Sequence, residues 1–115
     1  MDTRNKILDI AMNLNRMGNW AADDYEAKRE RIITFLGNTT QYIQSIDQTS
    51  FPPSFVATYD RFNKEYPRLE NEGIKGPKNS LEWAESLMTW GNILTHRSKL
   101  LTVSKPGEKD FREKE

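Results

Sequence analysis

Apolar side chains recur along the chain at the three- and four-residue steps of an α-helix. One stripe of such positions near the N-terminus predicts a helix over residues 3–17. Asp2 or Thr3 can cap its start, because a side-chain oxygen there accepts a hydrogen bond from an unpaired backbone N–H. Gly18 is the predicted stop, since glycine readily adopts the left-handed conformation that ends many helices.

A longer stripe follows after a short turn. It predicts a helix over residues 23–47, whose apolar positions step by four and three residues, as in helices that pack together. Acidic residues at Asp23 and Asp24 favour a helix start there, because they complement the helix dipole. Gly37 and Asn38 weaken the middle of this helix. The stripe keeps its phase across them, so we expect one long helix rather than two.

Prolines bound the third predicted helix. Pro52 and Pro53 mark its start, since proline is tolerated in a first turn, and an aromatic stripe predicts that it spans residues 53–66. Pro67 disfavours a helical conformation of the residue before it and therefore predicts the end. Two prolines and two glycines predict a long loop over residues 67–79, and long loops are frequently functional.

The last helix has the clearest start signal in the chain. Asn79, followed three residues later by Glu82, resembles a capping box, and the apolar arc beyond it predicts a helix over residues 80–101. Residues 104–115 are charged and lack an apolar stripe, so we expect a flexible tail. Residues 1–103 then form one all-α domain, a small antiparallel bundle of about four helices.

The composition agrees with a small helical domain that has a polar surface. The chain has 115 residues, of which 36% are hydrophobic and 30% are charged, enough for one core but not for two. The 17 basic and 17 acidic residues give a formal net charge of zero. Because nucleic-acid binding draws its affinity from neutralised phosphates, this balance disfavours nucleic acid as the partner.

Several chemistries lack the residues that they need. The chain has no cysteine and a single histidine, His96, which disfavours thiolate catalysis and zinc sites built from histidine and cysteine. The sequence contains no catalytic motif and no EF-hand spacing. We therefore expect a protein that is not an enzyme and uses neither metal nor cofactor. A signal-peptide pattern and a membrane-spanning apolar run are also missing, so we expect a soluble protein of the cytoplasm without membrane partners.

One loop offers a site for an anion. Gly76 lies in a segment that leads into a predicted helix N-terminus, where unpaired N–H groups attract negative charge. Lys75, Lys78 and Ser80 lie beside it in the sequence. No strand precedes this loop and it is not a P-loop, so a simple capped connection is the preferred interpretation.

Two short basic segments suggest nucleic-acid binding as an alternative function. Lys28, Arg29 and Arg31 surround an acidic residue in the second predicted helix, and Arg97 and Lys99 lie in the last one. Cations near a helix C-terminus are expected from the helix dipole alone. We therefore favour an ordinary helix surface over a nucleic-acid interface.

Tryptophans are the best candidates for contacts with a partner. Aromatic stripes at helical spacing usually form the core, but a short chain has limited interior, and aromatic residues at its edge make good anchors. Trp90 lies at the margin of an apolar arc, beside Arg97, and Trp20 lies in the predicted turn between the first two helices. We predict that these three residues contact a partner.

The leading hypothesis is therefore a helical protein–protein interaction module, such as a small subunit, adaptor or regulator. It would bind a protein partner or its own copy through helix faces. Two alternatives stay open, namely a nucleic-acid-associated protein that uses the basic helix segments and a protein that binds a small anion at residues 67–80.

Overall fold

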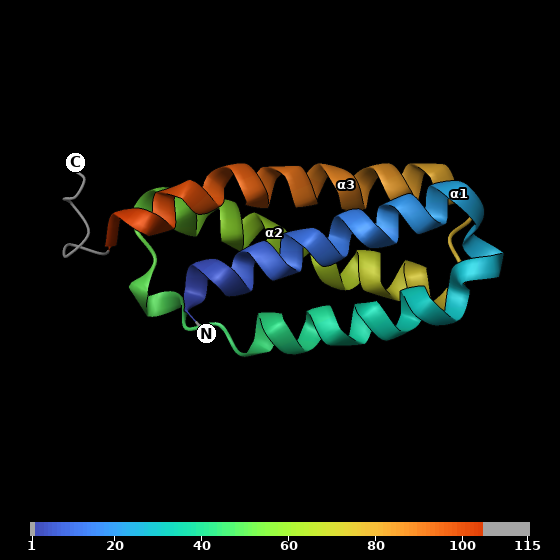
Figure 1. The fold of residues 1–115 in the computed structure, drawn as a ribbon, viewed down its shortest axis with the longest axis horizontal. Coiled ribbons are helices and arrows are strands. Elements are labelled where there is room, and N and C mark those ends of the chain that lie inside the picture. Colours follow the sequence, from blue (N-terminus) through green and yellow to red (C-terminus); the bar gives the residue numbers. More distant parts are fainter. Residues whose placement is uncertain (1, 105–115) are drawn as a thin grey trace.

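The computed structural model describes residues 2–104, and all regular structure in this range is helical (Figure 1). This finding confirms the all-α prediction. Three α-helices are present in place of the four predicted, because the first two predicted helices form one element. Most of the predicted tail, residues 105–115, lies outside the described range. The elements in chain order are α1 (Thr3–Gln44), η1 (Gln48–Ser50, a 3-10 helix), α2 (Pro53–Lys75), α3 (Ser80–Arg97) and η2 (Ser98–Ser104, a 3-10 helix).

α1 contains a sharp kink at Asp24, where the backbone leaves helical geometry with φ −165° and ψ 91°. The chain reverses its direction there, so that the second half of α1 runs back along the molecule (Figure 1). The Asp24 carboxylate accepts a hydrogen bond from the Ala27 N–H at 3.2 Å and thereby caps the second half. Elsewhere α1 stays helical, including at Gly37 and Asn38.

The predicted helix stop at Gly18 is wrong. The helix continues through Gly18 and Trp20, so the turn expected at residues 18–22 is helical. Gly18 is buried against α3, where a Cβ atom would lie 2.4 Å from Met88 Cγ and 3.0 Å from the Ala84 carbonyl oxygen. Glycine serves here to allow a close contact between helices, and not to form a left-handed turn.

The predicted helix end at residue 66 and the long loop over residues 67–79 are also wrong. α2 continues through Pro67 to Lys75, which leaves only residues 76–79 to connect it with α3. The length of the connection is therefore ordinary for two helices that pack side by side.

Tertiary contacts hold the last part of α2 in a helix despite its proline. Leu69 and Gly73 are buried. The Trp83 indole N–H donates to the Leu69 carbonyl at 2.9 Å, and the Tyr25 hydroxyl donates to the Gly73 carbonyl. These contacts offset the backbone hydrogen bond that Pro67 is unable to donate.

Among the remaining helix boundaries, the starts agree with the prediction at Thr3, Pro53 and Ser80, while two of the ends differ from it by a few residues. α1 ends at Gln44, before the predicted residue 47, and α3 ends at Arg97, before the predicted residue 101. α3 begins at Ser80 as predicted, and the Asn79 side chain accepts a hydrogen bond from the Glu82 N–H at 3.0 Å.

The buried apolar residues form one core cluster in an elongated molecule of 48 × 24 × 21 Å. α1 makes its most extensive contacts with α3, while α2 contributes a row of aromatic side chains to the core. The row in α2 consists of Phe55, Tyr59, Phe62 and Tyr66.

No helix in the described part of the chain combines the length and the apolar character needed to cross a bilayer.

Two tyrosines of this row allow a matched test of buried hydroxyl groups. The Tyr66 hydroxyl donates to the Leu36 carbonyl at 2.9 Å, whereas the Tyr59 hydroxyl has no hydrogen-bond partner among residues 2–104. We expect Tyr66→Phe to lower the free energy of unfolding by about 1 kcal/mol, because a buried hydrogen bond is lost. Tyr59→Phe is expected to leave that free energy unchanged or to raise it. Urea unfolding at neutral pH measures both.

Replacing Tyr59 with phenylalanine is also expected to change how the protein unfolds in alkali. Burial raises the pKa of Tyr59 from the ordinary 10 to about 12, so the folded protein holds this proton more tightly than the unfolded chain. The part of the free energy of unfolding that requires a protonated Tyr59 hydroxyl is intact below pH 10, and it is lost as the pH rises toward 12. Tyr59→Phe should therefore unfold at higher pH than the wild type, and an unchanged alkaline midpoint would contradict this assignment.

Candidate functional site

Trp90 lies at the seam between α2 and α3, and its surroundings differ from those of Trp83 two turns earlier. Trp83 is 3% exposed and belongs to the core. Trp90 is only partly buried, and its ring packs against the Phe62 ring of α2 with the centroids 5.5 Å apart. Trp90 therefore presents part of a large ring beside side chains from both helices.

A hollow of about 420 Å³ borders Trp90 toward the C-terminal end of α3, and this hollow is basic. Arg61 of α2 and Arg97 of α3 line it together with His96. The structure thus brings together two of the three predicted contact residues, Trp90 and Arg97. Sequence reasoning missed Arg61, because its place beside Arg97 depends on how α2 aligns with α3.

A second hollow of about 420 Å³ borders Trp90 toward the N-terminal end of α3, and this hollow is acidic. It is lined by Glu65 of α2 and by Glu82 and Glu85 of α3, together with the uncharged Ser86 and Thr89. We name the two hollows and the ring between them the Trp90 face. Its charged and titratable side chains are Arg61, Glu65, Glu82, Glu85, His96 and Arg97.

Most charges of the Trp90 face have no ion-pair partner within the described chain. Glu65 is the exception, because it pairs with Arg68 and its hydrogen bond raises the pKa of that guanidinium. The helix dipole favours acids near the start of α3 and cations near its end, but it does not require both to share a stripe with Trp90. Four side chains form no ion pair with any residue in 2–104, namely Arg61, Glu82, Glu85 and Arg97.

Trp20, the third predicted contact residue, lies elsewhere in the molecule. It belongs to the first half of α1, and the Phe35 ring meets its ring nearly at right angles with centroids 4.9 Å apart. The Arg31 guanidinium lies 5.1 Å from the centre of the Trp20 ring, within the range of a cation–π contact. Trp20 is partly buried by these neighbours and does not line either hollow of the Trp90 face.

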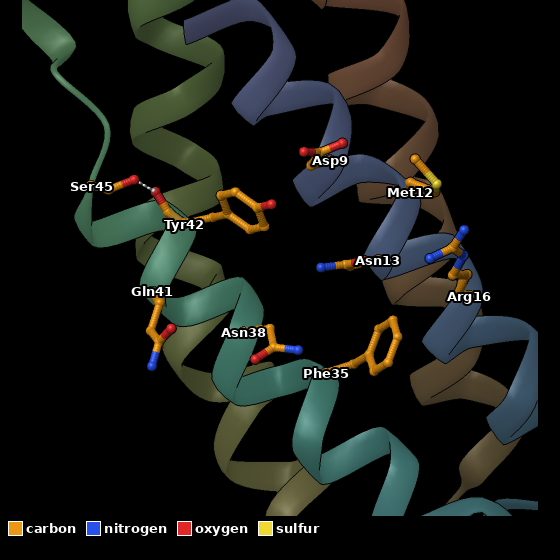
Figure 2. A pocket seen from close by; sticks show the side chains of 9 residues that line it. All are labelled: Asp9, Met12, Asn13, Arg16, Phe35, Asn38, Gln41, Tyr42 and Ser45. Atoms are coloured by element: carbon orange, nitrogen blue, oxygen red, sulfur yellow. Dashed lines mark hydrogen bonds between the residues drawn. The ribbon is translucent and has the colours of Figure 1, made fainter. Parts of the chain in front are cut away.

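A larger groove, of about 520 Å³, lies between the two halves of α1 (Figure 2). Asp9 and Arg16 line it from the first half, while Phe35 and Tyr42 line it from the second. The Tyr42 hydroxyl faces the Asp9 carboxylate, whose negative charge raises the pKa of Tyr42. Amide side chains line much of the remainder, namely Asn13, Asn38 and Gln41.

The α1 groove can form hydrogen bonds with a polar group, but its two opposite charges do not select one ligand class. One of its amides is already engaged, because Asn13 donates to the Thr39 hydroxyl at 3.4 Å. Sequence reasoning missed this groove, since its sides come from segments that meet only after the chain reverses at Asp24.

The basic residues of the nucleic-acid alternative that follow the kink contact neighbours within the chain. Lys28 forms an ion pair with Asp23 at 2.9 Å. Arg29 donates to the Ile74 carbonyl at 3.0 Å, and Arg31 lies over an indole ring as described above. Each of the three cations thus contacts a different neighbour within the chain, which is unfavourable for a shared phosphate-binding surface.

Arg97 and Lys99, the other basic residues of that alternative, lie at the far end of the molecule. α3 ends on the side opposite the kink of α1 (Figure 1). In a molecule 48 Å long, the two groups of cations therefore do not form one continuous basic surface.

The loop proposed for an anion is short and already capped. Lys75 ends α2, Gly76 adopts a left-handed φ of 99°, and Ser80 begins α3. The Asn79 side chain accepts the N–H of Glu82, and the Glu82 carboxylate adds negative charge to this helix start. Both features disfavour an anion. No three His, Cys, Asp or Glu side chains among residues 2–104 are grouped closely enough to hold a metal ion.

Comparisons with known proteins add no relative to this picture. No family model, no curated protein and no solved structure matches the chain. Its function is therefore inferred from its own residues and their arrangement.

Proposed function

We propose that this chain is a non-enzymatic protein–protein interaction module that binds its partner through the Trp90 face. The observation that carries the proposal is the position of Trp90 between two hollows of opposite charge. A large, partly exposed aromatic ring is a frequent centre of binding energy in protein interfaces. Charged groups around such a ring select the partner and fix its orientation.

The shape of the Trp90 face suits a helix as the partner element. The face extends along α3 from Glu82 to Arg97, which corresponds to about 24 Å of helix. A helix laid into the seam between α2 and α3 would place apolar side chains over Trp90 and Ile93. Its basic residues would lie at the acidic hollow and its acidic residues at the basic hollow.

The scaffold that we propose for this face is a bundle of four antiparallel helical segments, with the halves of α1 counted separately. The reversal at Asp24 supports this description, as does the close contact between the first half of α1 and α3. Gly18 and Gly91 allow that contact, because a Cβ atom at either position would lie within 3 Å of the facing helix. A firmly packed α3 would present Trp90 with little loss of conformational entropy on binding.

A photo-reactive amino acid at Thr89 tests the proposed function directly. Thr89 is exposed at the centre of the face, so we expect the probe to form a covalent adduct with a protein in cells that naturally produce this chain. Thr34 is a matched control, since it is an exposed threonine of α1 outside the face. The proposal fails if no protein adduct is specific to the Thr89 probe.

A further inference from the structure

We infer that the partner of the Trp90 face is a second copy of this chain, with the two α3 helices antiparallel across a two-fold axis. This inference rests on the proposed function, because it uses the same face. It is carried by the order of charges along the exposed stripe of α3, which is acidic before Trp90 and basic after it. A stripe ordered in this way is complementary to its own reversed copy, as a two-fold interface requires.

The positions along this stripe also match when one copy is reversed. Three- and four-residue steps, which keep side chains on one face of a helix, connect Glu82, Ser86, Thr89, Ile93 and Arg97, and Trp90 adjoins Thr89. With the axis between the two central residues, three pairs of positions face each other across the interface: Glu82 with Arg97, Ser86 with Ile93, and Thr89 with Trp90. Each pair occurs twice, so a single match along α3 contributes two contacts to the dimer.

Residues of α2 extend the same complementarity. Arg61 lies in the basic hollow and Glu65, one helical turn later, lies in the acidic hollow. In the dimer, each copy directs Arg61 toward the acidic hollow of the other. Glu65 is already paired with Arg68, so Glu82 and Glu85 supply the negative charge that is available to the second copy.

The polarity of the stripe selects the antiparallel arrangement. In a parallel arrangement Glu82 would meet Glu82 and Arg97 would meet Arg97, and like charges that face each other oppose association. The antiparallel arrangement also places the partly positive N-terminus of each α3 beside the partly negative C-terminus of the other, which is favourable. The partly buried rings of Trp90 then meet near the axis, where association removes their remaining exposure.

Sedimentation equilibrium of the purified chain, from micromolar to near-millimolar concentration, tests the inference. We expect a reversible dimer that weakens as salt concentration rises, because the ion pairs at its rim are screened. Arg97→Glu and Glu82→Arg should each weaken dimerisation by at least about tenfold, since each variant sets like charges opposite each other. The double variant should regain an affinity within about threefold of the wild type, because it restores both pairs with their signs exchanged.

The double variant separates a true contact from a loss of folding. Both substitutions oppose the dipole of α3, so the double variant is the least favourable for the isolated helix and recovers only if the two positions meet. Arg16→Glu is a control for net charge, because Arg16 is exposed on α1 outside the Trp90 face, and it should leave dimerisation unchanged. Circular dichroism checks that every variant keeps its helices.

The inference is overturned by a monomer at every concentration, or by a dimer in which the double variant stays as weak as either single variant. The Thr89 probe separates this failure from failure of the proposed function. A Thr89 adduct with a different protein, together with a monomeric chain, would retain the interaction module and remove the second copy as its partner. A monomeric chain without any Thr89 adduct would remove both.

Discussion

Replacing Trp83 with alanine is expected to lower the free energy of unfolding by about 3–5 kcal/mol, the usual cost of deleting a large buried ring. The Trp83 ring meets the Tyr25 ring at 89° and lies against Gly73, where a Cβ atom would approach it to 2.4 Å. Its indole N–H also donates to the Leu69 carbonyl at 2.9 Å. The substitution therefore removes the contacts that join α3 to α1 and to the last part of α2.

Urea unfolding followed by circular dichroism measures this loss, and Trp90→Ala is the matched control on the same helix. Because Trp90 is only partly buried, we expect its replacement to cost less than about 2 kcal/mol. Both variants should be measured at low protein concentration, so that self-association does not add to the stability of the wild type. Equal losses for the two variants would contradict the assignment of Trp83 to the core and Trp90 to the binding face.

The helical segments themselves could be predicted from the sequence, because the spacing of apolar residues records which face of each helix is buried. The aromatic row of α2 and the capped start of α3 at Ser80 both follow from such local patterns. The apolar stripe that runs through Gly37 likewise corresponds to continuous helix.

Two helix ends could not be predicted from local patterns. Gly18 and Pro67 are residue types that often end helices, yet both lie inside helices here. Contacts with distant residues decide each case, since Gly18 allows the close approach of α3 and Trp83 holds the segment after Pro67. The helix start predicted at Asp23 or Asp24 corresponds to the reversal at Asp24, but the turn predicted before it, at residues 18–22, is helical.

The candidate site could be predicted only on the helix that carries most of it. Trp90 and Arg97 follow from the margin between the apolar and polar arcs of one helix. Arg61 and Glu65 belong to α2, and their places opposite α3 depend on contacts such as that between Phe62 and Trp90. No local pattern encodes this alignment, so the opposite charges of the two hollows emerge only from the packed helices.

Replacing Pro67 with alanine is expected to raise the free energy of unfolding by about 2 kcal/mol. Pro67 is exposed inside α2, so its ring contributes little packing. A proline in a helix interior lacks one backbone donor and crowds the preceding turn, at a cost of about 3 kcal/mol. Part of this gain is offset, because alanine leaves the unfolded chain more freedom, by up to about 1 kcal/mol.

Pro53→Ala is the matched control for this prediction, and thermal unfolding compares the two variants. Pro53 is also exposed in α2, but it lies in the first turn, where its missing N–H has no partner within the helix. We therefore expect no gain from Pro53→Ala, against a clear rise in Tm for Pro67→Ala. If Pro67→Ala also gave no gain, a bend at Pro67 would be required for α2 to reach Trp83 and Tyr25. The packing of those two rings would then already compensate for the missing hydrogen bond. Straightening the helix would weaken that packing.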